Sequence, residues 1–137
     1  FFFHAYAGKR DAQESRGLGD VYKRQTVGNP HFMVEVNNVE NFELEDLYQL
    51  VNNNENFASG VNLEIYEIIN KEYVKARVYE RGVGETDACG SGALCMFNYL
   101  SKTNKIATNG YILYPGGELN LRFENEDLYL SGEVIYL

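Results

Sequence analysis

Residues 80–100 read ERGVGETDACGSGALCMFNYL, a polar, glycine-bearing loop that runs into an apolar segment. Glycines and polar side chains over residues 80–87 are typical of a loop. From Cys89 to Leu100 the apolar side chains recur at helical spacing, as expected for a helix that is buried in a core. Its predicted buried residues are Ala93, Leu94, Met96, Phe97 and Leu100. Polar residues 101–104 end this helix.

The chain around this window predicts an α+β domain. Residues 43–51 form a second predicted helix, with Leu44, Leu47, Leu50 and Val51 at helical spacing. Two apolar runs, 63–69 and 73–79, are joined by polar residues 70–72 and predict a hairpin. Further strands are expected at 32–36, 111–114, 118–123 and 128–136. The pattern gives neither a second domain nor an internal repeat.

Length and charge narrow the class of protein. A chain of 137 residues, 45% of them apolar, is sufficient for one domain with a core. Its net charge of −8 leaves little from which to build a cationic face, so neither nucleic acid nor an anionic membrane is expected as a partner. No apolar stretch approaches the ~20 residues of a membrane span. Two cysteines are too few for a disulfide scaffold and lack zinc-site spacing, which favours a cytoplasmic location.

The first 25 residues differ from the rest of the chain. They carry five basic and three acidic side chains (+2), whereas residues 26–137 carry seven basic and 17 acidic ones (−10). Residues 11–25, DAQESRGLGDVYKRQ, resemble a translated sequencing adapter. We therefore expect residues 1–26 to be a non-native or disordered leader and residues 27–137 to be the domain. The alternative is a genuine flexible arm.

Cys89 is the first candidate for chemistry. Thr86 and Asp87 are good N-cap types, so the helix should begin beside the cysteine. The positive end of the helix would then lower the pKa of the thiol and make it a usable base. Glycines at 90 and 92 would let a ligand carboxylate approach the backbone. The alternative is that Cys89 is a small buried apolar residue.

Cys95 is expected to be structural. It lies about 240° around an ideal helix from Cys89, and roughly 9 Å along it, so the two thiols should not form a disulfide. Gly90-x-Gly92 lacks the third glycine of a dinucleotide-binding motif, so no nicotinamide site is expected.

Four segments, in this order, resemble the diaminopimelate epimerase family: VGNPH at 27–31, VN at 61–62, ERGVGET with ACGSGA over 80–93, and PGGEL at 115–119. The resemblance covers residues 27–137 and matches only the C-terminal half of the family. It implies half of a two-domain fold, in which each domain is a mixed or antiparallel sheet wrapped around a central helix, here at about 88–101. Ser91 stands where the family often has threonine, and Ser59-Gly60 lacks an arginine often found there.

The resemblance also implies an activity, namely the interconversion of LL- and meso-2,6-diaminopimelate in lysine and cell-wall precursor biosynthesis. Two thiols act on opposite faces of the α-carbon, without cofactor or metal. Cys89 matches one of them, and the other belongs to the N-terminal domain. This fragment is therefore expected to be inactive alone, and to associate through its uncovered face, for example as a homodimer.

Further site residues come from the same resemblance. His31 and Glu80 match residues that tune the cysteine, and the substrate-binding positions are Asn29, Asn62, Glu80, Arg81, Gly90 and Ser91. Without the resemblance, His31 and Asn62 would be interpreted as turn residues and Glu80 with Arg81 as a surface ion pair.

Two other functions stay open. One is a related isomerase of the same two-domain fold, either proline racemase-like or phenazine-pathway-like; Cys89 argues against the second. The other is a non-catalytic half-domain that binds a small molecule, in which Cys89 would react slowly with an ordinary pKa.

Overall fold

The structure, a computed structural model, describes residues 2–4, 30–54 and 60–132. Its helices are α2 (Leu44–Asn52) and α3 (Gly90–Lys102). Its strands are β1 (Phe2–His4), β2 (Pro30–Glu35), β3 (Asn62–Ile68), β4 (Tyr73–Glu80), β5 (Gly84–Thr86), β6 (Asn109–Tyr114), β7 (Gly117–Glu124) and β8 (Asp127–Ser131). The predicted α+β class is confirmed.

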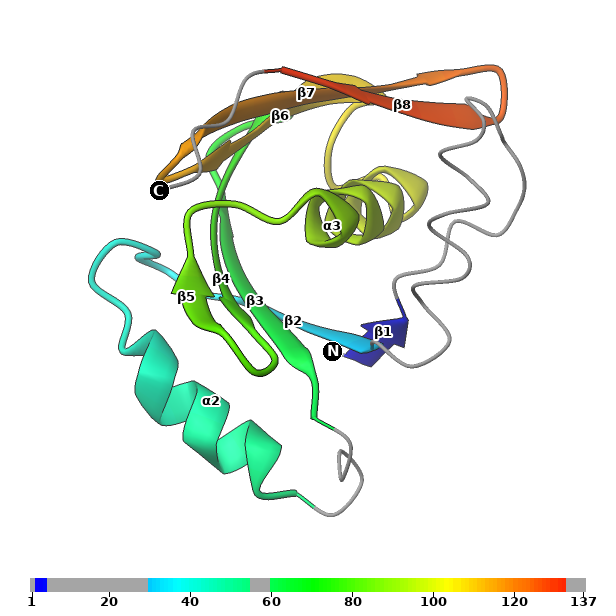
Figure 1. Cartoon of the computed structure of the whole chain (residues 1–137). Coiled ribbons are helices and arrows are strands. Elements are labelled where there is room, and N and C mark those ends of the chain that lie inside the picture. Colours follow the sequence, from blue (N-terminus) through cyan, green and yellow to red (C-terminus); the bar gives the residue numbers. More distant parts are fainter. Residues whose placement is uncertain (1, 5–29, 55–59, 133–137) are drawn as a thin grey trace.

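The strands form one mixed sheet that curls around α3 (Figure 1). Their order is β1-β2-β3-β4-β6-β7-β8, and β5 pairs with β4 outside this path. Strands β2 and β3 are parallel, as are β4 and β6, whereas the other neighbours are antiparallel. This arrangement confirms the expected sheet around a central helix.

The main core lies between the inner face of the sheet and α3. Strand β4 shows how the sequence builds it, because Val74, Ala76 and Val78 are buried while Lys75 and Arg77 between them are partly exposed. Alternate side chains of a strand point to opposite faces, so the apolar set meets the helix. The same cluster contains the helix residues Ala93, Leu94, Cys95, Met96, Phe97 and Leu100.

The predicted hairpin of β3 and β4 is present and antiparallel. Its turn is held by Asn70, whose side-chain oxygen accepts hydrogen bonds from the N–H groups of Glu72 (2.8 Å) and Tyr73 (3.0 Å). An asparagine that bonds the backbone two and three residues ahead stabilises a tight turn.

Helix α2 lies on the outer side of the curled sheet (Figure 1). Leu44 and Tyr48 pack there against Leu63 and Ile65 of β3. Leu50, although it shares the helical spacing of the apolar residues, does not join the buried face and is 73% exposed. Six residues after Leu44, it is rotated about 120° away from that side chain on an ideal helix.

Three sequence-based expectations differ from the structure or are only partly tested by it. The predicted loop over 80–87 contains β5, which returns along β4 and pairs Thr86 with Val78. The last predicted strand, 128–136, is observed as β8, and residues 133–137 lie outside the described part. Most of the predicted leader lies outside it too, although Phe2–His4 pair with β2 as β1. The leader therefore stays a prediction.

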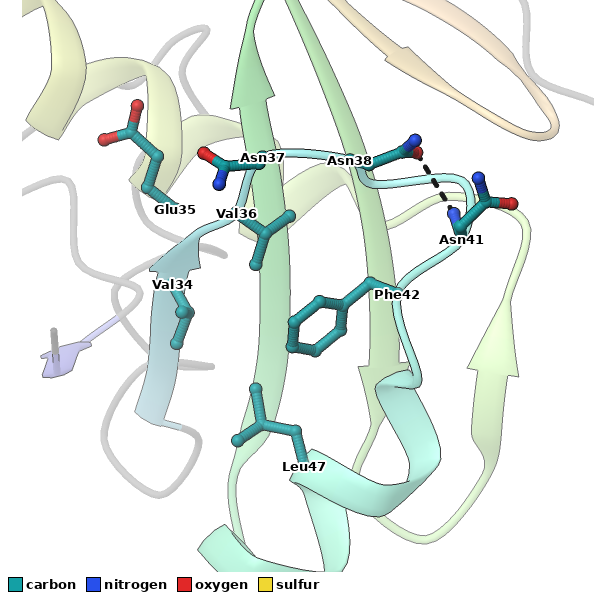
Figure 2. A pocket seen from close by; sticks show the side chains of 8 residues that line it. All are labelled: Val34, Glu35, Val36, Asn37, Asn38, Asn41, Phe42 and Leu47. Atoms are coloured by element: carbon teal, nitrogen blue, oxygen red, sulfur yellow. Dashed lines mark hydrogen bonds between the residues drawn. The ribbon is translucent and has the colours of Figure 1, made fainter.

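A shallow pocket lies between the end of β2, the loop that follows it and α2 (Figure 2). Val34, Val36, Phe42 and Leu47 form its apolar wall. Glu35, Asn37, Asn38 and Asn41 complete the lining. Among the described residues, no helix has the length and apolar character required to cross a membrane.

Candidate active site

Cys89 is the N-cap residue of α3. Its backbone is extended (φ −144°, ψ 110°), and the helix begins at the next residue, Gly90. The sulfur accepts a hydrogen bond from the N–H of Gly92 at an N···S distance of 3.4 Å. The expectation that Thr86 or Asp87 caps the helix is wrong, because the thiol itself occupies the capping position.

The pKa of Cys89 is not lowered, contrary to the sequence-based expectation. Burial raises the pKa of Cys89 to about 12, and the nearby charge of Glu64 adds to this increase. Hydrogen bonds from Ser91 and from the Gly92 N–H act in the opposite direction but do not outweigh burial. The thiol side chain is only 8% exposed, so little water reaches it to solvate a thiolate. At neutral pH the resting group is a thiol.

His31 and Glu64 form a buried pair beside the cysteine. Nδ1 of the imidazole lies 2.8 Å from Oε2 and 3.1 Å from Oε1 of the carboxyl group, and neither side chain is exposed. The two residues lie on the neighbouring parallel strands β2 and β3, where His31 is aligned with Asn62. Burial raises the pKa of Glu64, and the attraction of His31 opposes that increase. His31 is thus held by a partner rather than lying in a turn.

Ser91 connects this pair to the thiol. Its hydroxyl oxygen lies 3.5 Å from Cys89 Sγ and 3.5 Å from Nε2 of His31. These distances suit a weak contact to sulfur and are long for an O–H···N hydrogen bond. The side chains therefore form a line of successive contacts from the sulfur to the carboxyl group, in the order Cys89, Ser91, His31 and Glu64.

Gly92 makes room for the carboxylate of Glu64. A Cβ atom built at Gly92 would overlap the Oε2 atom of Glu64 and lie 2.9 Å from its carboxyl carbon. The expectation that this glycine opens the backbone to a ligand is wrong, since a side chain of the same protein fills the space. At Gly90, by contrast, no described heavy atom other than those of its chain neighbours and its own helix backbone lies within 4 Å of the Cβ position. That residue keeps the approach to the helix end open.

The remaining predicted binding residues gather where β3 and β4 lie side by side. Oδ1 of the buried Asn62 accepts a hydrogen bond from the backbone N–H of Arg81 at 2.7 Å. The Arg81 stem passes so close to Gly60 that a Cβ there would lie 2.6 Å from its Cγ. Glu80 accepts a hydrogen bond from the Thr86 hydroxyl at 2.7 Å. Asn62 thus fixes the backbone at the exposed Arg81.

The structure tests the two cysteine predictions but not the one for Asn29. Both thiols are free, as expected, and Cys95 is buried in the core at 1% exposure. Asn29 lies outside the described residues. The described part contains no group of three or more His, Cys, Asp or Glu side chains that could hold a metal ion.

Glu64 is the site residue that sequence reasoning missed. It stands in the run Leu63-Glu64-Ile65, a charged residue between apolar ones in a predicted strand. Such alternation usually places the polar side chain in solvent. Here both faces of β3 are covered, by α3 and by α2, so every residue of the run is buried. The available signal was a charged residue within a mostly apolar strand. If such a strand is buried on both faces, the charge requires a partner.

The fold is found in a solved protein of known class. A Bacillus anthracis phenazine biosynthesis protein of the PhzF family matches with a TM-score of 0.52 and 16% sequence identity, over 74% of this chain and 33% of that one. At this identity the match shows the fold alone. The chain therefore has the α+β fold, a sheet curled around a central helix, of that class of protein.

Sequence comparison identifies the family within this class. The diaminopimelate epimerase family model matches residues 24–137, and the chain belongs to that family. The diaminopimelate epimerase of Brachyspira hyodysenteriae is 40% identical over 114 residues, covering 81% of this chain and 40% of the relative. That of Xanthomonas oryzae pv. oryzae is 35% identical over 136 residues, covering 96% and 48%. The chain thus spans less than half the length of these relatives.

Proposed function

We propose that this chain supplies one of the two proton-transfer groups of a diaminopimelate epimerase. The reaction would interconvert LL- and meso-2,6-diaminopimelate by removing the α-proton on one face and returning a proton on the other. Cys89 is the group we assign to this chain. The observation that carries the assignment is its position at the start of α3, beside the open approach at Gly90, in a chain of this family.

The protonation state of Cys89 suggests its part in the cycle. Because its pKa is raised to about 12, the resting thiol is ready to donate a proton. A second group on the opposite face of the α-carbon must then be the base in that direction. In the reverse direction Cys89 must lose its proton, which requires help from its neighbours.

Substrate recognition is assigned to the residues around the helix end. The backbone N–H groups of Gly90 and Ser91 lie in the first turn of α3, where a carboxylate is favoured by the helix dipole. Arg81 is exposed and can bind a second carboxylate in bidentate fashion. Glu80, Asn62 and Asn29 are proposed to bind the ammonium groups and the remaining oxygens. The two free thiols support a cytoplasmic location.

A chimera tests this assignment. Residues 27–137 would replace the corresponding part of the Brachyspira hyodysenteriae enzyme. NMR in deuterated water would then follow both the exchange of the substrate α-proton and the conversion of the LL form to the meso form. We expect activity that is lost in Cys89→Ala and retained in Cys95→Ala, the matched control in the core. A folded chimera without activity would contradict the proposal.

The alternative is a half-domain that binds a small molecule without catalysis. The raised pKa of Cys89 favours it, since a thiol that is protonated at neutral pH is a poor base. In that case the chimera would bind diaminopimelate in calorimetry, and neither cysteine substitution would change its affinity.

A further inference from the structure

Gly60, which lies shortly before β3, packs against the side chain of Arg81. A Cβ atom built at Gly60 would overlap Cδ of Arg81 and lie only 2.6 Å from its Cγ, closer than real Cβ atoms approach other atoms. The stem of Arg81 therefore fills the space that a side chain at position 60 would need. Gly60 is buried, and it belongs to the Ser59-Gly60 pair that lacks an arginine often found there in the family. The glycine is thus a departure of this chain from the family pattern.

The backbone at Arg81 is held by two contacts. Its N–H donates a hydrogen bond to Oδ1 of the buried Asn62 at 2.7 Å. Glu80, the preceding residue, is paired with Gly84 of β5. With both contacts in place, a side chain at position 60 would force the Arg81 side chain into another staggered rotamer. Rotation near the backbone moves the far end of a side chain most, so the guanidinium group would move farther than the stem.

The charges of Glu80 and Arg81 act on different sides of the sheet. Burial raises the pKa of Tyr48 on the outer helix α2, and the charge of Arg81 acts in the opposite direction. On the inner side, burial raises the pKa of Cys89, and the charge of Glu80 adds to that increase. Although the two residues are neighbours in the chain, one charge therefore lies near the thiol and the other lies toward α2.

We propose that Gly60 is a positioning residue that directs the guanidinium group of Arg81 to the second carboxylate of the substrate. The lack of a side chain at position 60 lets the Arg81 stem lie across the glycine, where its guanidinium group can form a bidentate pair with that carboxylate. This position selects a substrate with two carboxylates over one that has a carboxylate only at its reacting end. The inference rests on the proposed function, for which it names a residue that determines how the second carboxylate is recognised.

Gly60→Ala and Gly84→Ala form a matched pair of variants. Both glycines have a positive φ, +89° and +114°, so an alanine at either position strains the backbone. The new methyl group would meet Arg81 only at position 60. At Gly84 a Cβ would meet no described heavy atom within 4 Å beyond its chain neighbours, and these do not include Arg81. The pair therefore separates displacement of Arg81 from backbone strain.

The kinetic constants of the chimera for LL-diaminopimelate test the role of Gly60. Displacing Arg81 removes hydrogen bonds to a charged group, so Gly60→Ala should raise KM by about tenfold or more. The reacting end of the substrate stays in place, so kcat should remain within about twofold of the parent value. Gly84→Ala should leave KM unchanged. Equal increases of KM in the two variants would overturn the proposal.

A double-mutant cycle shows whether Gly60 acts through Arg81. Arg81→Ala removes the stem that the new methyl group would displace, so adding Gly60→Ala to it should not raise KM further. Two increases that simply multiply would overturn the proposal. If the chimera binds diaminopimelate without converting it, the Kd from calorimetry replaces KM in the same cycle.

The contact itself can be measured without substrate or substitution. Proton NMR of the 137-residue chain should give a nuclear Overhauser effect between the α-protons of Gly60 and the side-chain protons of Arg81. Its absence would overturn the proposal, even if circular dichroism showed that Gly60→Ala does not fold. An inactive chimera with this contact present would contradict only the proposed activity. An active chimera whose KM does not respond to Gly60→Ala would contradict only the role of Gly60.

Discussion

The carboxylate of Glu64 occupies the space that a side chain at Gly92 would need. The two residues lie on β3 and on the first turn of α3, so their contact fixes how closely the helix approaches the sheet. Because Glu64 is fully buried and bonded to His31, it cannot move aside without breaking that pair.

Gly92→Ala should therefore destabilise the protein by about 1–3 kcal/mol, the usual cost of overpacking a core. Urea unfolding followed by circular dichroism gives the free energy. Gly90→Ala is the matched control, because a Cβ there would meet nothing within 4 Å beyond its chain neighbours and its own helix backbone, and it should change stability by less than about 1 kcal/mol. Equal effects of the two substitutions would contradict the packing argument.

His31→Leu should cost about 3–5 kcal/mol at neutral pH, because it leaves the Glu64 charge buried without its imidazole partner. Burial raises the pKa of Glu64 above 4.5, so the folded state favours the protonated carboxyl group. The stability that the Glu64 carboxyl group contributes is present below its pKa in the unfolded chain. It is lost as pH rises through its pKa in the folded protein. The variant should thus recover stability on acidification to about pH 4.5. A loss that is independent of pH would argue against a buried carboxylate as the cause.

Cys89 should make the protein sensitive to alkali. Its folded pKa of about 12 exceeds the ordinary value of 9.0, so the stability it contributes is complete below pH 9.0 and is lost as pH rises through 12. Thermal unfolding of the parent chain and of Cys89→Ala between pH 8 and about pH 11 tests this. The variant should lose less stability over that range, and parallel curves would show that the thiol does not titrate as described.

The 137-residue chain should not invert diaminopimelate on its own. Inversion needs an acid and a base on opposite faces of the α-carbon, and Cys95, the second of the two cysteines in the sequence, is buried in the core. Incubation with LL-diaminopimelate, followed by chiral chromatography, should show no meso form. Formation of the meso isomer, lost again in Cys89→Ala, would mean that another residue of this chain is the second group.

Elements with a regular apolar period were predictable from the sequence. The β3–β4 hairpin and α3 lie within a few residues of their predicted bounds, since their apolar residues form runs or recur at a regular spacing. The pairing of β5 with β4 was not, because three residues are too few to show a period. The exposure of Leu50 was not predictable either, since the position of the sheet decides which side of its helix is covered.

The site was predictable as a set of residue types, but not in its electrostatics. Cys89, Ser91 and His31 are brought together, yet the direction of the thiol pKa shift depends on burial and on Glu64. Both follow from contacts between residues distant in the chain, such as the 33 positions that separate His31 from Glu64. The local sequence predicts the helix end and the glycines beside Cys89. Tertiary packing determines whether burial or the hydrogen bonds of the helix end dominate the pKa of the thiol.

The buried pair of His31 and Glu64 has a consequence for the alignment of β2 on β3. In a strand, a shift by one residue turns every side chain to the opposite face. If β2 slipped by one position, Phe32 would replace His31 beside Glu64, and the buried carboxylate would face a ring with no hydrogen to donate. The apolar residues of β2 could tolerate such a slip, but the polar pair could not. The buried pair beside Cys89 thus ensures that the two strands join in only one way.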